Sequence, residues 1–208
     1  MNFFNLISTP GLGQNQDGIK ETEKSYGQAN LAIKSNVSNG NLFVKGFHNT
    51  FIDQGFEIDI GYVYNSQAAL PWRLNLGKTI KTITGNYNEP GSMVTVIEND
   101  GHESKYTYDA ARKCYVNMGD VGSSTLTFAN GRWEGWNPLT QISEHYDNNG
   151  RLEKLINPDG SALQFSYDDN GRLTSVRGNS NEIVIEYDGQ KTKIFLVANG
   201  KKNVMDGK

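Results

Sequence analysis

Two tryptophans, Trp133 and Trp136, offer the clearest chemistry for ligand recognition in this sequence. They lie three residues apart in Trp-Glu-Gly-Trp, and two indole rings beside a glycine could form a platform on which a sugar ring stacks. Trp133 also follows Asn-Gly-Arg, a frame that carries leucine at two later places in the chain. Packing of Trp133 in the core is therefore the favoured interpretation, and sugar binding stays open as the alternative.

Spacings typical of metal-binding and catalytic residues are missing from the sequence. The three histidines, His48, His102 and His145, show neither the close pairing nor the neighbouring cysteines of metal sites, and we predict them in turns or at the surface. Asp147 and Asp168 each begin an Asp-x-Asn-Gly stretch similar to a calcium loop. The later acidic ligands are absent, so we interpret both aspartates as turn caps. Without a nucleophile elbow or P-loop, the sequence predicts no catalytic site, no metal and no cofactor, hence no enzyme.

A seven-residue stretch returns along the chain and indicates how such side chains are positioned. Tyr-Asp-Asn-Asn-Gly-Arg-Leu at 146–152 recurs as Tyr-Asp-Asp-Asn-Gly-Arg-Leu at 167–173, and a shorter Tyr-Asp-Gly copy begins at residue 187. A unit of this length holds two strands and two short turns, so each copy is predicted to be one β-hairpin that stacks on its neighbours. The residues predicted to carry the repeat are Tyr146, Asp147, Gly150, Arg151, Leu152, Tyr167, Asp168, Gly171, Arg172, Leu173, Tyr187 and Asp188.

Alternation within the copies predicts a sheet with one apolar face. Tyr146, Tyr167 and Tyr187 share one repeat position, and the residues two and four before each are mostly apolar, whereas the intervening ones are mostly polar. Alternate residues of a strand point to the same side, so the three tyrosines are expected on one face of the sheet. Arg151 and Arg172, which follow glycine in each copy, are expected to stack over tyrosine rings or to pair with the aspartates of their turns.

Turn residues extend the hairpin pattern over nearly the whole chain. Asn-Gly pairs begin at residues 39, 130, 149, 170 and 199, and Asp-Gly pairs at 17, 100, 159, 188 and 206. Such pairs supply the positive φ of tight hairpin turns. We predict an all-β fold, an antiparallel β-hairpin repeat array. It comprises an irregular polar lead over 1–30 with one or two helical turns, a β region over 31–98, and repeats over 99–208. Residues 194–197 are predicted to form the last strand, with an open edge.

Composition and charge reduce the number of partner classes to be considered. The chain has 208 residues and a formal net charge of −3, so electrostatics give no reason to expect nucleic acid or an anionic membrane as a partner. No apolar run is long enough to span a bilayer, and the N-terminus lacks the basic leader and full hydrophobic region of a Sec signal. The single cysteine, Cys114, excludes an internal disulfide and is interpreted as a small packed residue.

The two full copies, with Pro158-Asp159-Gly160 between them, are similar to the RHS, or YD, repeat family. Segments at 39–43, 62–66 and 72–75 also resemble the region that precedes the repeats in bacterial RHS proteins. The resemblance implies a long strip of hairpins that curves into part of a hollow β-shell, which in bacterial toxins encloses a cytotoxic segment. The DPxGL-like self-cleavage motif of the family does not occur in this sequence, so self-cleavage is not expected.

Two classes of function follow from the resemblance. The first is a non-enzymatic structural segment that scaffolds or encapsulates a secreted toxin or effector. Its partners would be further RHS repeats or another chain at the C-terminal edge, the enclosed segment, and the delivery machinery. The second is a cell-surface carbohydrate- or protein-binding module built from YD repeats. Under either reading we expect export by a specialised bacterial route or attachment to the cell surface.

Overall fold

The fold is all-β and antiparallel, as predicted. The computed structural model describes residues 21–26, 31–36, 40–67, 72–117, 124–189 and 191–205. These residues form one sheet of five strands and one of 13 strands. The described ranges contain no helix, and therefore none that could cross a membrane. In all eight Asn-Gly and Asp-Gly pairs whose glycine falls in these ranges, that glycine has a positive φ, as hairpin turns require. The pairs at 17 and 206 lie outside the described residues.

The first sheet is dominated by one long hairpin. Its strands, in order across the sheet, are β1 (Glu21–Tyr26), β2 (Leu31–Asn36), β3 (Asn41–Asp53), β4 (Phe56–Asn65) and β5 (Trp72–Leu74). β3 and β4 meet in a two-residue turn at Gln54 and Gly55, both at positive φ. An irregularity in the pairing between Phe47 and Asn49 divides the hairpin. The half near the tip contributes Phe51 and Phe56 to the main core.

The second sheet contains the repeats, and every strand in it neighbours the next strand of the sequence. Alternation decides which residues are buried, since Leu163 and Phe165 are buried whereas Gln164 and Ser166 are exposed. Its strands are β6 (Thr79–Thr84), β7 (Met93–Ile97), β8 (Glu103–Asp109), β9 (Cys114–Val116), β10 (Thr125–Ala129), β11 (Arg132–Asn137), β12 (Ile142–Tyr146), β13 (Leu152–Ile156), β14 (Ala162–Tyr167), β15 (Leu173–Arg177), β16 (Asn181–Asp188), β17 (Lys191–Ala198) and β18 (Lys201–Val204).

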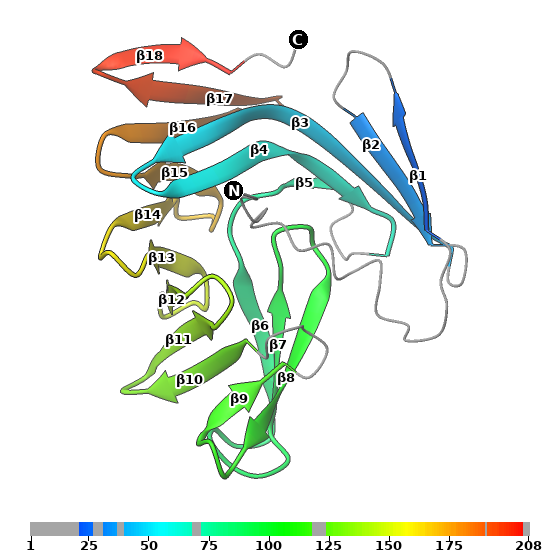
Figure 1. Ribbon diagram of the computed structural model, residues 1–208, viewed down its shortest axis with the longest axis vertical. Helices are drawn as coiled ribbons and strands as arrows, with labels where there is room; N and C mark the ends of the chain where they lie inside the picture. The colour runs from blue at the N-terminus through cyan, green and yellow to red at the C-terminus, as the bar shows by residue number, and fades with distance from the viewer. Residues whose placement is uncertain are drawn as a thin grey trace.

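The second sheet curves until its first strand meets the middle of the array. Figure 1 shows the strands stacked in order from β18 at the top down to β9. There the sheet turns back, so that β8, β7 and β6 run upward beside the stack. At the point of contact Ile80 donates its N–H to the carbonyl of Gly150 at 2.7 Å, and Leu152 donates to the carbonyl of Lys78 at 2.9 Å. An isolated bridge joins Thr79 to Arg151. The repeat turn at 147–152 is therefore fixed by β6 as well as by its own hairpin.

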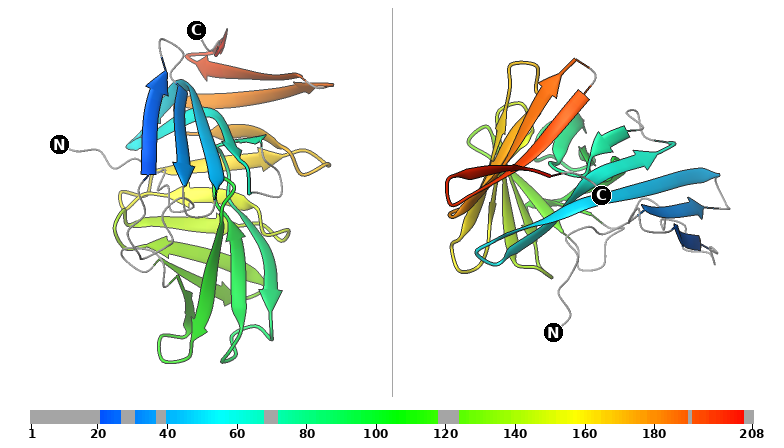
Figure 2. Two further views of the ribbon diagram at one scale, coloured as in Figure 1. Left: turned by 90° about the vertical axis from the view of Figure 1, so that its right-hand side faces the viewer. Right: turned by 90° about the horizontal axis from the view of Figure 1, so that it is seen from above.

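The main core lies between the two sheets. The β3–β4 hairpin crosses the fanned strands of the repeats, as both views of Figure 2 show. Phe51, Phe56 and Ile60 from this hairpin share one hydrophobic cluster with Leu163 and Ile183 of the repeats. Each of these side chains is at most 1% exposed. Burial of apolar surface contributes about 25 cal/mol per Å², so this contact between the sheets is a major source of stability. Cys114 is buried, as expected of a small packed residue.

Two expectations about the N-terminal half need revision. Residues 21–26, predicted as part of an irregular lead with helical turns, form β1 and pair with β2 over all six residues. Pairing with a neighbouring strand thus overrides the low strand propensity of this charged run. The rest of the lead, 1–20 and 27–30, lies outside the described residues. The change from one sheet to the next falls between Leu74 and Thr79, so β6 and β7 join the sheet that carries the repeats.

The predicted C-terminal edge is displaced by one strand. Residues 194–197 were expected to form the last strand, but β18 follows the tight turn at Asn199 and Gly200 and pairs with β17. Met205 extends this pairing, since its N–H donates to the carbonyl of Ile194 at 2.8 Å. The expectation was wrong because four residues after a two-residue turn suffice to add a short strand. The open edge is therefore that of β18.

Candidate functional site: the tyrosine and arginine ladder

The three repeat tyrosines lie on the inner face of the sheet, as the alternation predicted. The hydroxyl of Tyr167 donates to the carbonyl of Leu152 at 2.8 Å, and that of Tyr187 donates to the carbonyl of Leu173 at 2.8 Å. The same contact is thus made in successive copies. Tyr146 departs from it, because its hydroxyl donates to a carboxylate, Glu144 Oε2, at 2.6 Å. Burial raises the pKa of all three phenols, so they stay protonated donors at neutral pH.

The repeat arginines stack and pair at the same time. The guanidinium of Arg151 lies 4.5 Å from the ring centroid of Tyr167, and that of Arg172 lies 4.4 Å from the ring of Tyr187. Each guanidinium also binds the aspartate of its own turn, Arg151 to Asp147 at 2.6 Å and Arg172 to Asp168 at 2.8 Å. The two arrangements considered from the sequence are therefore realised together. Each turn presents its arginine to the tyrosine of the following copy.

The aspartates of these turns act as caps, as we interpreted them. Asp147 Oδ1 accepts the backbone N–H groups of Asn149 at 2.9 Å and of Arg151 at 2.8 Å. Asp168 repeats this with the second copy, and the backbone hydrogen bond from Arg172 is the main cause of its lowered pKa. Among the described residues there is no group of three or more His, Cys, Asp or Glu side chains that could hold a metal. The third copy differs, because Asp188 lies at the end of β16 and is the backbone pairing partner of Lys191 in β17.

The leucines that end the motif are buried, and Trp133 shares their environment. Leu152 is 2% exposed, Leu173 is 7% exposed and Trp133 is 7% exposed. Trp133 packs with Tyr115 and Phe128 at ring-centroid distances of 5.2 and 4.8 Å. These contacts agree with the interpretation of Trp133 as a core residue.

Trp136 lies on the opposite face of β11. It is 43% exposed, whereas Trp133 is buried, because residues three apart on a strand point to opposite sides. A platform formed by both indoles is therefore ruled out by the strand geometry. Any platform on the outer face consists of Trp136 with its cross-strand neighbours Thr125 and Ser143.

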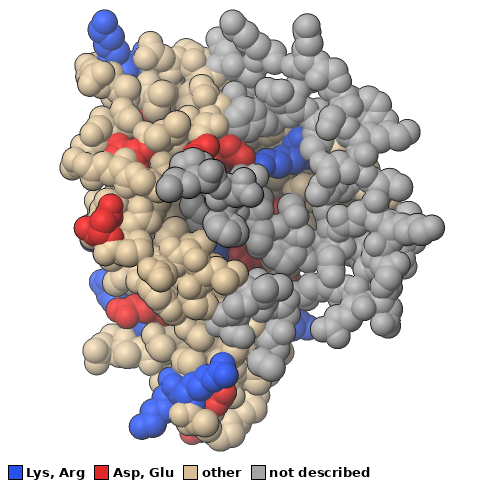
Figure 3. Space-filling view, viewed as in Figure 1, with Lys and Arg blue, Asp and Glu red and all other residues tan. Residues whose placement is uncertain are grey.

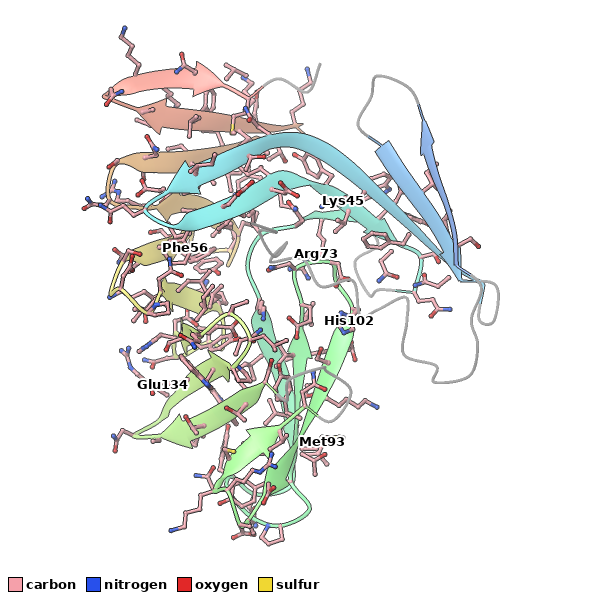
Figure 4. All side chains as sticks on the ribbon, in the orientation of Figure 1. Lys45, Phe56, Arg73, Met93, His102 and Glu134 are labelled. Carbon is pink, nitrogen blue, oxygen red and sulfur yellow. The ribbon has the colours of Figure 1, made fainter. Side chains whose placement is uncertain are left out.

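A groove lies beside the ladder, between β5 and the inner face of the repeats. Its volume is about 410 Å³. Trp72 and Leu74 line it from the first sheet, and Arg172, Leu173 and Tyr187 line it from the second. Figure 4 shows Arg73 of β5 between the first sheet and the upper ends of β6 to β8. The sequence did not reveal this groove, because its two walls lie about a hundred residues apart in the chain.

A partly buried ion-pair cluster lies at the contact between β6 and the array. Lys78 Nζ lies 3.1 Å from Glu98 Oε2 and 2.7 Å from Glu144 Oε1. Burial opposes the charge of Lys78, but the two carboxylates outweigh it and raise the pKa of the amine well above its usual value. The hydroxyl of Tyr146 completes the arrangement through Glu144. This cluster ties β6, β7 and β12 together.

A histidine of the β7–β8 turn occupies a triad-like arrangement that the sequence reasoning missed. His102 Nδ1 lies 3.0 Å from Asp100 Oδ1, and its Nε2 lies 3.0 Å from Ser104 Oγ. The signal was an Asp-x-His-x-Ser alternation, which places all three side chains on one side of the chain. His102 lies in a turn, one of the two places predicted for the histidines, but at 9% exposed it is not at the surface. Ser104 is 2% exposed, so its hydroxyl is closed to a substrate and the trio connects the turn internally.

The other two histidines stand apart from this trio. His145 is half-exposed on β12 and lies 4.0 Å from Glu134 Oε1. His48 lies in β3, and its side chain is outside the described part of the chain.

Stacked antiparallel hairpins that repeat one Tyr, Asp and Arg unit define a β-hairpin repeat protein. Residues 146–182 match the protein family described as RHS Repeat. This part of the chain therefore carries RHS repeats, as its YDxxGRL copies indicated. No curated protein matches this chain.

Proposed function

We propose that this chain is a non-catalytic structural segment of a β-shell that scaffolds or encapsulates a secreted toxin or effector polypeptide. The observation that carries the proposal is the one-sidedness of the curved repeat sheet. Along β14 and β16 the inner positions Leu163, Ile183 and Ile185 are at most 3% exposed, while Gln164 and Glu186 on the other face are exposed. A curved sheet whose inner face is buried and whose outer face is exposed to solvent is suited to form one side of a shell.

The state of the polar groups in the ladder supports a structural role. The hydroxyls of Tyr167 and Tyr187 are occupied by backbone carbonyls, and Arg151 and Arg172 are bound to aspartates of their own turns. A catalytic site needs polar groups that are free to reach a substrate. The repeated groups instead hold one hairpin to the next.

The outer surface gives little support for a nucleic-acid partner. On the face seen in Figure 3, basic and acidic side chains are interspersed among uncharged residues. A nucleic-acid surface needs basic residues gathered in a patch or stripe. The formal net charge of −3 likewise gives no support for a nucleic-acid partner.

A cell-surface carbohydrate- or protein-binding module remains the second candidate, and Trp136 is the observation that favours it. Its indole is 43% exposed on the outer face of β11, next to the hydroxyl-bearing residues Thr125 and Ser143. An exposed aromatic ring with hydroxyl neighbours can stack on a sugar ring. Glycan-array binding that disappears in Trp136→Ala supports this candidate.

Co-expression with the polypeptide encoded next to this chain tests the encapsulation proposal. We expect the neighbouring polypeptide to co-purify and to resist limited proteolysis in the complex, while it is cut when expressed alone. Asp53→Ala, which removes a contact between the two sheets, is expected to restore cleavage, whereas Asp169→Ala at an exposed turn position is the matched control. A neighbour that fails to co-purify, or that is cut equally in both states, contradicts enclosure.

A further inference from the structure

We infer that the groove beside β5 binds an extended polypeptide segment carrying a large apolar side chain, by adding a strand to the free edge of β5. The inference rests on the proposed function and deepens it, since it names the place where an enclosed polypeptide docks. Two independent features of the structure carry it. One is an unpaired backbone edge, and the other is the composition of the groove walls.

Among the described residues, one edge of β5 has no strand paired to it. Asn75 donates its N–H to the carbonyl of Gly61 in β4 at 3.1 Å. Backbone direction alternates along an antiparallel strand, so the N–H and C=O groups of Arg73 point toward β4, and those of Trp72 and Leu74 point away. Within the described part of the chain β5 pairs with β4 alone. One of these outward groups, the carbonyl of Leu74, accepts a long hydrogen bond of 3.4 Å from Arg73 Nε.

The walls of the groove are mainly apolar and aromatic. On one side Trp72 is 62% exposed, a large value for an indole beside the core. On the other side the groove is bounded by Leu173 and Tyr187, with Arg172 and Thr192 beside them. An exposed ring facing a second apolar wall forms a slot for a side chain such as phenylalanine or leucine.

The polar groups near the groove favour a polypeptide over a sugar. Sugar sites need several free donors and acceptors, but the hydroxyls of Tyr167 and Tyr187 are occupied by backbone carbonyls. Arg172 is bound to Asp168, and Arg73 donates to the carbonyl of Gly77 at 3.0 Å. The outward backbone groups of β5 have no strand partner among the described residues, and an added strand satisfies them by pairing.

A labelled peptide titration of the whole chain tests the inference. The probe is a short blocked peptide of alternating threonine and valine with one central phenylalanine, followed by fluorescence anisotropy. We expect saturable binding, and roughly tenfold weaker binding after Trp72→Ala, because tryptophan is enriched among the residues that contribute most to binding. Trp136→Ala removes the exposed indole of the outer face and is the matched control, expected to bind as the unchanged protein does.

A second probe separates strand addition from simple apolar binding. The same peptide with methylated backbone nitrogens cannot donate hydrogen bonds to β5, and we expect it to bind roughly tenfold more weakly. A third probe, a linear glucose oligosaccharide, is expected not to compete. Equal binding of the methylated peptide, equal binding to Trp72→Ala, competition by the oligosaccharide, or no peptide binding at all overturns the inference.

The two proposals can fail separately. A chain that protects its co-expressed neighbour but does not bind the peptide contradicts the groove inference alone. A chain that binds the peptide at Trp72 but leaves its neighbour open to protease contradicts encapsulation alone.

Discussion

The side-chain carboxylate of Asp53 accepts the backbone N–H of Asn181 at 2.6 Å, across 128 residues of sequence. Asp53 ends β3 at the tip of the long hairpin, and Asn181 begins β16 in the repeats. The same carboxylate accepts the N–H groups of Ser180 at 2.8 Å and Asn179 at 3.2 Å. Ser161 strengthens the junction by donating its hydroxyl to the carbonyl of Gln54 at 2.9 Å. The tip of the first sheet is therefore latched onto two turns of the second.

Removal of this carboxylate is expected to destabilise the protein. Asp53 is 4% exposed, so Asp53→Ala leaves the N–H groups of the 178–181 turn without their acceptor. We expect a loss of about 3 kcal/mol in the free energy of unfolding, as for other buried hydrogen bonds to a charged group. Urea denaturation measures it, with Asp169→Ala as the exposed control. Equal stability of the two variants would show that the latch is not a stabilising contact.

Gly178 is expected to be coupled to Asp53. A Cβ on Gly178 would lie 2.5 Å from Asp53 Cγ, and its φ is not in the left-handed region, so the cost of Gly178→Ala is steric. In an Asp53→Ala background the two closest contacts, with the carboxyl atoms, are gone and only the contact with Cβ of residue 53 at 2.9 Å is left, so the clash is smaller. We expect the two changes to be non-additive by about 1 kcal/mol or more in a double-mutant cycle. Additive effects would mean that the turn moves away from Asp53.

Two glycines with similar backbone conformation are expected to differ in their tolerance of alanine. Gly131 has a φ of +77 with open space around it, whereas a Cβ on Gly150, at a φ of +75, would lie 2.8 Å from the carbonyl oxygen of Ile80. Gly131→Ala is expected to cost about 1 kcal/mol from backbone strain. Gly150→Ala is expected to cost about 2 kcal/mol more, because it also disturbs the contact with β6. Thermal or urea unfolding of the two variants measures these losses of stability. Equal losses would contradict a close contact between Gly150 and Ile80.

The face assignment in the repeats predicts unequal effects at neighbouring positions. Tyr167→Ala is expected to cost about 3 kcal/mol, as for other large truncations of packed side chains. Tyr167→Phe, which loses only the hydrogen bond to Leu152, is expected to cost about 1 kcal/mol. Gln164→Ala, on the exposed face, is expected to change stability by less than about 0.5 kcal/mol. Equal losses at Tyr167 and Gln164 contradict the assignment.

His102 is expected to make stability depend on pH. Burial lowers its pKa, but the hydrogen bond to Asp100 and the charges of Asp100 and Glu98 outweigh burial and the opposing charge of Lys78, so the pKa is raised. A raised pKa in the folded state means that the charged form stabilises the fold. That stabilisation is fully present below about pH 6.5, the ordinary value, and is lost as pH rises through the higher folded value.

A pair of variants isolates this effect. We expect the stability difference between the unchanged protein and His102→Asn to shrink as pH rises from about 5.5 to about 8.5. His145→Asn, at a half-exposed site on β12, serves as the control. A difference that grows with pH contradicts a charged, paired His102.

Local patterns determined which parts of this fold could be predicted. The positions of Tyr167 and Leu173 followed from alternation, and the turns followed from Asn-Gly and Asp-Gly pairs, because both signals act within one hairpin. The latch between Asp53 and Asn181 could not be predicted, since no local pattern relates residues so far apart. The same holds for the groove beside Trp72, whose walls meet only when the first sheet folds across the repeats.

The last prediction concerns the open edge of β18, which is expected to pair weakly with a second copy of the chain. Met205 directs its N–H toward β17, so by alternation the N–H groups of Lys202 and Val204 point away from β17. Residues 201–204 are all exposed, and an exposed edge is a template for another strand. The lysines at 201 and 202 oppose uncontrolled association, so a weak dimer is expected instead of an aggregate.

Sedimentation across a wide range of concentration tests this expectation. Val204→Pro removes an outward N–H without breaking a bond to β17, and it is expected to keep the protein monomeric. Val204→Thr keeps the N–H and is the matched control, expected to dimerise like the unchanged chain. In an extended array the next repeat would pair at this edge, so a peptide copy of residues 181–204 should also bind there. A chain that stays monomeric at every concentration, with or without the proline, contradicts an open edge and favours a self-contained binding module.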